Sequence, residues 1–323
     1  MPIDISRSGT NPFRDLNLFR QYYQALRAER PAAYLSWTIK PNLYGGLAAR
    51  TAGVPAFANV SGLGTAFLSG GLLGHFVSLL YKLAFRKAAV VYFQNVDDRN
   101  LFVGERLVRA DQARLLPGSG INLKRFAMTA LPRGAGIRFL MVARLLGDKG
   151  VREYVDAARL ARRNVPEAKF GLLGPIDDGN RTAISADELG GWVREGVIDY
   201  LGEVSDIRPQ LADATVIVLP SYREGLPRSL LEGAAMGRPL IATDVPGCRE
   251  LVEDSVNGFL CLPRDPDSLS AAMIRMAKLD EPLRAEMGAR SRQLAEERFN
   301  EELVTKAYVL ALAEVEARGT GRS

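Results

Sequence analysis

The clearest sign of the fold is the stretch TVIVLPSYREGLPRSLLEGAAMG, residues 215–237, in which a short apolar run leads through a charged loop into a helical pattern. A continuous β-branched run such as 215–219 is typical of a strand buried on both faces of a parallel sheet. Similar runs alternate with helical patterns on either side of it, so we expect a doubly wound α/β domain that binds its ligand outside the carboxyl ends of its strands. The other expected strands are 137–143, 169–173, 198–201, 238–243 and 258–262, and the expected helices are 151–163, 205–213, 226–236, 247–254 and a helical tail over 266–318.

The first part of the chain has a sparser pattern. Residues 13–28 predict an amphipathic helix, and strand-like runs follow at 33–37, 54–59 and 89–94, with 115–117 as a candidate fourth. A full doubly wound domain has about six strands. We therefore expect a second Rossmann-like domain that is incomplete at its N-terminal end. The apolar stripe of the first helix is expected at Leu16, Phe19, Tyr22, Tyr23 and Leu26.

Two domains also fit the length of 323 residues, at roughly 100–200 residues per domain. The polar, glycine-containing segment PGSGINLKRF, residues 117–126, is predicted to link them. The expected divisions are an N-terminal domain over 1–127, a C-terminal domain over 128–303 and a C-terminal helix over 304–323.

Composition excludes several classes of protein. With 47% hydrophobic and 24% charged residues, the chain is not disordered, collagenous or a coiled coil as a whole. The two cysteines, Cys248 and Cys261, form no CxxC motif, so they indicate neither a zinc site nor a disulfide framework. The first ten residues lack the apolar core of a signal peptide.

The net charge of +5 is unevenly distributed. Residues 1–130 contain 16 Lys and Arg against 7 Asp and Glu, whereas residues 131–323 contain 26 against 30. Such asymmetry favours an anionic partner for the first part, either a phosphate, an acidic membrane or a nucleic acid. An arginine-rich composition without a partner is the alternative.

Residues 51–81 contain no charged residue, yet Pro55, Asn59 and several glycines interrupt the run, so it does not predict a membrane span. Residues 72–87 are different. Leu72, Phe76, Leu79, Leu80 and Leu83 form a stripe that Lys82, Arg86 and Lys87 accompany. A helix of this kind can lie in a membrane interface, and a helix packed on its own sheet is the commoner alternative.

The charged loop of 215–237 offers candidate ligand groups. The N–H groups of Gly225, Leu226 and Arg228 are expected at a helix N-terminus, which is an anion site suited to a diphosphate. Glu224 precedes this helix and Glu232 lies about two turns into it, so both carboxylates can accept hydrogen bonds from the hydroxyls of a sugar and a ribose. The alternative is that one caps the helix and the other lies on the surface.

A second candidate element, FLMVARLLGDKG at 139–150, also follows a strand. Arg144 and Lys149 flank its short turn, and two cations there can hold a diphosphate leaving group. The alternative is ordinary surface charge. Other signals are weaker: Asp265-Pro266-Asp267 has the form of a metal motif but is better placed to cap a helix, and His75 lies away from any strand end. No GxGxxG or Walker A motif is present.

Together these elements resemble family-4 retaining glycosyltransferases of the GT-B fold. The resemblance rests on the Glu224/Glu232 pair, on Arg144 with Lys149-Gly150, and on the segments GSGINLKRF and DVPGCRELVEDSVNGFL. It covers essentially the whole chain. The segments TIKPNLYGGLAAR (38–50), NVSGLGTAF (59–67) and YFQNVDDRNLF (92–102) further resemble bacterial enzymes that extend polyprenyl-diphosphate-linked saccharides, among them N-acetylgalactosaminyltransferases and O-antigen and capsule enzymes.

The resemblance implies a UDP-sugar donor held mainly by the second domain. Arg144 and Lys149 would neutralise the departing diphosphate, Glu224 would hold the donor sugar and Glu232 the ribose. The uracil would be framed by the residues Gly174, Glu203, Val204 and Ser205. Such enzymes retain the anomeric configuration without an evident protein nucleophile, and the resemblance implies no metal or other cofactor.

The first domain would hold the lipid-linked saccharide, which implies a cytoplasmic protein peripheral to the inner face of the cytoplasmic membrane. Its loop 59–64 contains Gly62 and Gly64, which allow a close backbone approach to a ligand, but not the histidine that many members place there.

One alternative remains open and two are disfavoured. Because the chain opens at ISRSGTNPF (5–13), where similar enzymes have completed about two βα units, it could be a catalytically incomplete fragment that binds nucleotide sugars. A UDP-sugar epimerase is disfavoured by the lack of the acid/base groups that such chemistry needs, and nucleic-acid binding by aromatics that do not interleave with cations.

Overall fold

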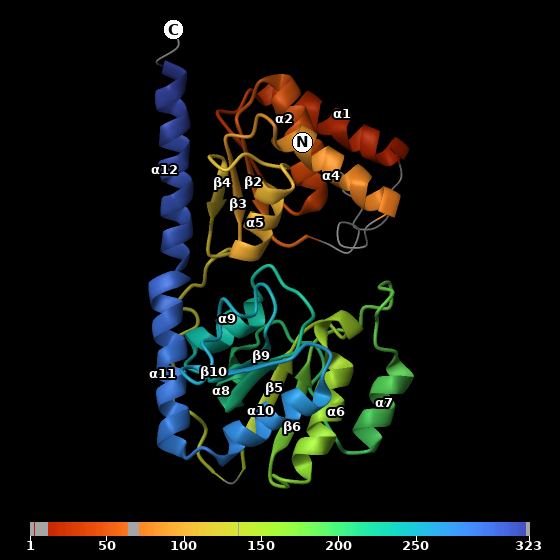
Figure 1. Ribbon diagram of the computed structural model, residues 1–323, viewed down its shortest axis with the longest axis vertical. Helices are drawn as coiled ribbons and strands as arrows, with labels where there is room; N and C mark the ends of the chain where they lie inside the picture. The colour runs from red at the N-terminus through yellow and green to blue at the C-terminus, as the bar shows by residue number, and fades with distance from the viewer. Residues whose placement is uncertain (1–2, 4–11, 64–70, 135, 321–323) are drawn as a thin grey trace. The chain divides into compact units, whose positions relative to one another are not determined.

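The computed structural model describes residues 3, 12–63, 71–134 and 136–320 (Figure 1). Within them the chain forms two compact units. Unit 1 contains residues 1–119 and 302–323, and unit 2 contains residues 120–301. Each has its own parallel sheet, so the expected α/β class with two parallel sheets is confirmed.

Unit 1 is built on a four-stranded parallel sheet with the order β1-β2-β3-β4. Alternate residues of its strands face opposite layers. Phe93 of β3 packs with Tyr81 and Phe102 on one face, while Tyr92 packs against Tyr308 on the other. The elements are α1 (Pro12–Glu29), β1 (Tyr34–Trp37), a π-helical turn (Pro41–Gly45), α2 (Gly46–Ala52), β2 (Ala56–Val60), α4 (Gly71–Phe85), β3 (Val90–Phe93), α5 (Val96–Gly104), β4 (Ala113–Leu115) and α12 (Glu301–Thr320).

Unit 2 is built on a six-stranded parallel sheet with the order β10-β9-β8-β5-β6-β7. The central strands β5, β8 and β9 are apolar and buried on both faces, as their β-branched runs predict. Its strands are β5 (Arg138–Val142), β6 (Lys169–Leu173), β7 (Asp199–Tyr200), β8 (Val216–Leu219), β9 (Leu240–Thr243) and β10 (Gly258–Cys261). Its helices are the 3₁₀ turn Gly147–Lys149, α6 (Val151–Arg162), α7 (Ala186–Arg194), α8 (Arg208–Asp213), α9 (Arg228–Ala235), α10 (Pro266–Lys278) and α11 (Glu281–Arg298).

The units divide at 119/120 and 301/302, which differs from the expected divisions at 127/128 and 303/304. Part of the predicted linker belongs to the core of unit 2, because Ile121 and Phe126 are buried there and the Ile121 N–H donates to the Phe299 carbonyl over 2.8 Å. The expected separate C-terminal helix packs on unit 1, where Tyr92 donates to the Ala307 carbonyl over 3.1 Å.

Two local predictions need correction. The stretch 247–254 forms turns rather than a helix, and its Gly247 has a φ of +83°. The buried stripe of α1 contains Leu18 in place of the expected Leu16, which is exposed. The stripe expected for residues 72–87, for which two orientations were open, lies outward in α4 at Phe76, Leu79 and Leu83, whereas Tyr81 and Phe85 are buried.

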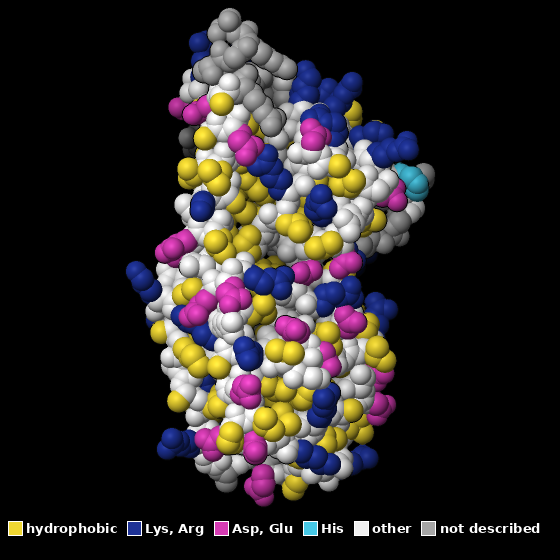
Figure 2. Space-filling model, turned by 60° about the vertical axis from the view of Figure 1, so that its left-hand side comes forward, with side chains coloured by type: hydrophobic (Ala, Val, Ile, Leu, Met, Phe, Trp, Pro, Cys, Tyr) yellow, Lys and Arg dark blue, Asp and Glu magenta, His cyan; other side chains and the backbone are white. Residues whose placement is uncertain are grey.

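Among the described residues, no helix combines the length and the apolar character that crossing a bilayer requires. In Figure 2 the single histidine lies at the edge of unit 1, with an acidic side chain beside it and Lys and Arg side chains nearby. This distribution is consistent with the cationic balance of residues 1–130 in the sequence.

Candidate functional site

The candidate site lies where the neighbouring strands β8, β5 and β6 of unit 2 end. Because these strands are parallel, their carboxyl ends meet at one edge of the sheet, where doubly wound domains bind ligands. A cavity of about 540 Å³ lies at this edge. It is lined by Val142, Ala143, Arg144, Lys149, Leu173, Gly174, Pro175, Glu203, Val204, Ile207, Leu219, Glu224, Leu226, Pro227, Arg228, Ser229 and Glu232.

Lys149 and Glu224 form an ion pair across this cavity. Lys149 ends the loop after β5, Glu224 lies in the loop after β8, and Nζ lies 2.5 Å from Oε1. Their side chains are 23% and 12% exposed, so water screens the pair only partly. The structure therefore places a cation and a carboxylate in contact, both reachable from the cavity.

Arg144 points into the same cavity from the loop after β5 and is paired with Asp177, whose Oδ2 lies 2.8 Å from Nη1. Asp177 belongs to the loop after β6, which is held against the β5 loop by the Gly147 N–H donating to the Thr182 carbonyl over 2.6 Å. The two side chains are more exposed than Lys149 and Glu224. An anionic ligand could thus compete with Asp177 for the guanidinium.

The start of α9 supplies hydrogen-bond donors to the cavity. Pro227 occupies the N-cap position, and no side chain caps the helix there. The first-turn N–H groups of a helix have no intrahelical acceptors and favour an anion. The helix therefore begins at Arg228, two residues after the start expected from the sequence at 226.

Glu232 lies one turn along α9 and accepts hydrogen bonds from Arg228, whose Nη2 is 3.0 Å from Oε1. Burial raises the pKa of the Glu232 carboxyl, and the charge of Arg228 only partly offsets this. A half-desolvated carboxylate beside a cavity is a strong acceptor for the hydroxyl groups of a ligand.

Backbone contacts hold the two charged loops together. Ser221 Oγ donates to the Asp148 carbonyl over 3.2 Å, and the Tyr222 N–H donates to the same carbonyl over 3.0 Å. Gly247 packs closely against the backbone of the Glu224 loop, since a Cβ on it would collide with the carbonyl oxygens of Glu224 and Gly225. Gly174 has a φ of +146°, and a Cβ there would collide with the Ala143 carbonyl. The charged side chains therefore project from a rigid frame.

Most of the predicted site residues come together here. Arg144, Lys149, Glu224, Glu232, Leu226, Arg228, Gly174, Glu203 and Val204 all line the cavity. Ser205 does not line it, and Gly225 contributes only as the link between Glu224 and Leu226. Gly62 follows β2 in unit 1 with a φ of +141°, and Gly64 lies outside the described residues.

Sequence reasoning missed Asp177 and Ser229. Asp177 follows strand β6 in the segment GPIDDGN, at the same edge as Arg144, so its position after a strand was the available signal. Ser229 lies in the first turn of α9 beside Arg228.

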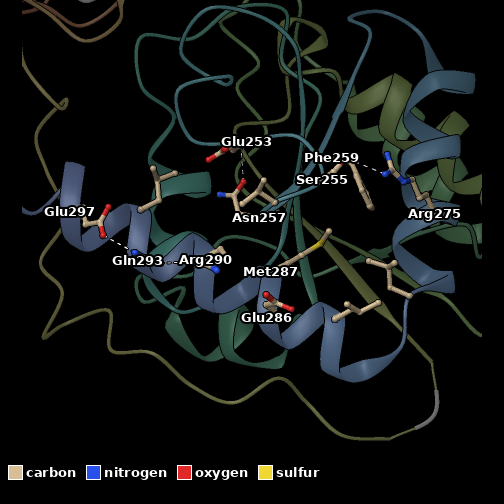
Figure 3. Close-up of a pocket in the computed structure, with 14 residues that line it drawn as sticks. Glu253, Ser255, Asn257, Phe259, Arg275, Glu286, Met287, Arg290, Gln293 and Glu297 are labelled. Atoms are coloured by element: carbon tan, nitrogen blue, oxygen red, sulfur yellow. Dashed lines mark hydrogen bonds between the residues drawn. The ribbon is translucent and has the colours of Figure 1, made fainter.

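A second hollow of about 690 Å³ lies between α10, α11 and the turn before β10 (Figure 3). Arg275 donates to Ser255 Oγ over 3.1 Å and lies 4.0 Å above the ring of Phe259. Gln293 donates to Glu297 over 2.8 Å. Strand β10 begins at Gly258, beside this hollow. The hollow therefore lies at the amino edge of the sheet, away from the charged loops.

Within the part of the chain that the structure describes, no three His, Cys, Asp or Glu side chains are grouped as metal ligands. Asp265, the first carboxylate of the DPD segment, caps α10 by accepting from the Ser268 N–H over 2.9 Å. The capping interpretation of this segment is therefore confirmed.

Comparisons with known proteins agree with this geometry. Residues 136–278 match a family model described as "Glycosyl transferases group 1", and residues 1–95 match one described as "Glycosyl transferase 4-like". The first match contains all of the cavity-lining residues of unit 2.

Individual proteins are similar over most of the chain. One is the N,N'-diacetylbacillosaminyl-diphospho-undecaprenol alpha-1,3-N-acetylgalactosaminyltransferase of Campylobacter jejuni, 29% identical over 95% of this chain and 83% of that protein. Another is the UDP-Gal:alpha-D-GlcNAc-diphosphoundecaprenol alpha-1,3-galactosyltransferase of Escherichia coli, 26% identical over 81% of this chain and 70% of that protein. The solved structure of Anabaena HepE in complex with UDP superposes with a TM-score of 0.76 at 20% identity, covering 92% of this chain and 82% of that one.

Proposed function

The chain belongs to the group 1 glycosyltransferases of GT-B fold, and from this premise we propose that it transfers a hexose or N-acetylhexosamine from a UDP-sugar to a polyprenyl-diphosphate-linked saccharide. The observation that carries the proposal is the meeting of Lys149, Glu224, Arg144 and the first turn of α9 around one cavity. Cations, helix donors and carboxylates together match a ligand that has a diphosphate between two polyhydroxylated sugars.

The diphosphate of the donor binds to Arg144, Lys149 and the N–H groups at the start of α9. When the bond between the sugar and the diphosphate breaks, negative charge grows on the departing phosphate oxygen. Fixed cations and helix donors in a partly desolvated cavity stabilise that charge more than water does. Arg144 and Lys149 thereby supply positive charge without requiring a metal.

The carboxylates orient the two sugars of the donor. Glu224 lies against Lys149 and holds the hydroxyls of the transferred sugar, and Glu232 holds the vicinal hydroxyls of the ribose. The residues Gly174, Glu203, Val204 and the neighbouring Ser205 frame the uracil. The acceptor hydroxyl attacks the anomeric carbon on the face that UDP leaves, and its proton passes to the departing phosphate, so the configuration is retained.

The acceptor assignment rests on the two relatives whose names include a diphospho-undecaprenol-linked sugar. Unit 1 binds this acceptor, with the backbone around Gly62 able to approach it closely. A polyprenyl-linked acceptor lies in a bilayer, so the chain works at the inner face of the cytoplasmic membrane as a peripheral protein. The product is a growing surface polysaccharide or glycan.

The test is transfer of radiolabel from a panel of UDP-hexoses and UDP-N-acetylhexosamines to a polyprenyl-diphosphate-linked saccharide. We expect one donor to be used and Glu224→Gln to abolish transfer. Asp213→Asn is the matched control, since Asp213 pairs with Arg138 outside the cavity. An EDTA arm should leave transfer unchanged.

A chain that binds UDP in calorimetry but transfers no sugar would overturn the proposal in favour of a nucleotide-sugar-binding protein. Full activity in Glu224→Gln would instead overturn the assignment of the site.

A further inference from the structure

The outward face of α4 in unit 1 has an unusual composition. Phe76, Leu79 and Leu83 are 55%, 52% and 37% exposed. Lys82 is exposed on the same helix, and Arg86 is exposed in the turn directly after its last residue. At 100° per residue the four helical positions fall within one face of the helix, which Arg86 extends beyond its C-terminal end. Large apolar side chains thus alternate with cations on a surface that water contacts.

A hollow of about 700 Å³ lies beside this face. Leu79 and Leu83 form one wall and Val103, at the end of α5, belongs to the opposite wall. Leu107 and Val108 are buried and complete an apolar lining. Such a hollow suits a hydrocarbon chain, because most of its lining offers no hydrogen-bond partner.

Cations surround the mouth of the hollow. Lys82, Arg86, Arg106 and Arg109 line it, and its lining includes no Asp or Glu. Arg109 is neutralised by Asp111, whose Oδ1 lies 2.9 Å from Nε. Within the described residues, the structure records no ion pair to Lys82, Arg86 or Arg106.

The sequence around the helix strengthens this charge. From Arg30 through Val96 the chain has six Lys and Arg and no Asp or Glu. Three cations with no opposing carboxylate produce a local positive potential that attracts anions at short range. The charge complement of the face is therefore anionic.

The hollow is separate from the ligand-binding edge of its own sheet. α4 leads into β3 and α5 leads into β4, so the C-terminal ends of these helices lie at the amino ends of the strands. Ligands of a doubly wound sheet bind at the opposite, carboxyl edge. A partner docked on α4 therefore leaves the carboxyl edge open.

We propose that α4 and this hollow dock unit 1 onto an anionic phospholipid bilayer. Phe76, Leu79 and Leu83 enter the acyl boundary, one lipid chain occupies the hollow, and Lys82, Arg86 and Arg106 bind the lipid phosphate. An amphipathic, cation-rich helix has this mode of binding. The inference extends the proposed function by assigning a surface to its membrane contact, but the surface is argued from α4 itself.

The first test is co-flotation of the purified full chain with vesicles of phosphatidylcholine alone or with added phosphatidylglycerol. We expect binding only to the anionic vesicles and a loss of binding as salt rises. A cation near an anionic surface strengthens binding about fivefold, so Lys82→Gln/Arg86→Gln/Arg106→Gln should weaken it on the order of 100-fold. The control Arg163→Gln/Lys169→Gln/Arg181→Gln changes the net charge equally on unit 2 and should bind like the parent chain.

Equal losses in the two triple variants would overturn the proposal, because binding would then follow net charge. Equal flotation on both kinds of vesicle would overturn it as well. Self-association of the parent chain that Leu79→Gln abolishes, without vesicle binding, would assign the face to a second copy and also overturn it.

The second test follows insertion directly. Leu79→Trp should show a blue shift of its fluorescence on anionic vesicles and quenching by lipids brominated in the acyl chain, relative to the parent chain with Trp37 and Trp192. Absence of quenching would refute insertion. Neither test uses a sugar donor, so binding without transfer would refute only the proposed function, and transfer without binding only this inference.

Discussion

The Lys149–Glu224 pair makes a prediction in which two neighbouring substitutions change UDP affinity in opposite directions. In the free chain the Glu224 carboxylate is paired with the Lys149 ammonium, which the diphosphate needs, and Nζ lies 2.5 Å from Oε1. Lys149→Met removes the cation and keeps the length of the side chain. Glu224→Gln keeps the shape of the acid but removes both the competitor for Lys149 and the like charge facing the diphosphate.

The magnitudes follow from the burial of the pair. A charge-assisted hydrogen bond to a phosphate contributes about 2 kcal/mol, so Lys149→Met should weaken UDP binding roughly 30-fold. The ion pair that Glu224→Gln releases is less than a quarter exposed on either side, and we assign it a net value of about 1 kcal/mol after desolvation is counted. UDP should then bind about fivefold more tightly to Glu224→Gln, while sugar transfer is lost in both variants.

The assay is isothermal titration of UDP, with thermal unfolding of each variant in parallel. Lys149→Met leaves a mostly buried carboxylate without its cation, so it should be destabilised by about 1–2 kcal/mol. The double variant Lys149→Met/Glu224→Gln should regain most of that stability. Arg159→Met is the control, because its pair with Glu195 lies between α6 and α7 and away from the cavity. UDP affinities that move in the same direction for the two single variants, or that do not move at all, would refute the reasoning.

Three further predictions concern other buried groups. Glu232 has a raised pKa, so UDP affinity should fall as pH decreases toward that pKa and the carboxylate is protonated, and Glu232→Gln should lack this dependence in titrations. A carboxyl whose pKa is raised by folding stabilises the folded chain below the ordinary glutamate pKa, and this stabilisation is lost as pH rises through the folded pKa. Glu232→Gln should therefore be at least as stable as the parent chain at neutral pH and should lose that advantage in acid. Burial raises the pKa of Cys261 to about 12 and that of Cys248 further, so neither thiol should react with a disulfide reagent at neutral pH until denaturant is added; rapid reaction in the native chain would contradict the burial. Arg238 is fully buried, donates to the carbonyls of Thr129, Ala130 and Ala214, and has its pKa lowered to about 10 by desolvation. Arg238→Met should lower the free energy of unfolding in urea by about 2–4 kcal/mol. Arg238→Lys should not restore the lost stability, because an ammonium cannot span the three carbonyls.

The sheet of unit 2 could be predicted because its strands repeat one simple pattern. β5, β8 and β9 are apolar on both faces, so their runs cannot be placed anywhere but the centre of a covered parallel sheet. The charged loops follow these strands directly. Once the strands are parallel, Arg144 and Glu224 have to emerge at one edge, and this geometric consequence located the site without any knowledge of its side-chain contacts.

The partners of the site residues could not be predicted in the same way. Glu224 was expected to face a sugar and Lys149 a diphosphate, yet in the free chain the two face each other. Their contact spans 75 residues of sequence, and the pairing depends on the twist that brings neighbouring loops together. The same holds for Arg144 and Asp177, which lie on separate loops.

The sequence left the orientation of α4 open for a different reason. Its sequence is apolar on nearly every face, so periodicity does not say which stripe is buried. The structure buries Tyr81 and Phe85 against Phe102, with the Tyr81 ring edge to face and the Phe85 ring tilted, and leaves Phe76 and Leu79 outward. A helix whose apolar residues exceed what its sheet can cover has a second apolar face, and that surplus is the physical basis for the docking surface.

Net charge likewise predicts where anions bind only when the position of each charged group is known. Residues 131–323 carry more Asp and Glu than Lys and Arg, yet the proposed anion site lies there. An anion responds to the charges within about a Debye length, so Arg144, Lys149 and the donors of α9 outweigh distant carboxylates on the same unit. In unit 1 the surplus cations are exposed around α4 and its hollow, where they act on a surface instead of a pocketed diphosphate. Net charge alone therefore does not decide where an anion binds. The negative unit binds an anion through a few positioned groups, and the positive unit attracts one through an extended face.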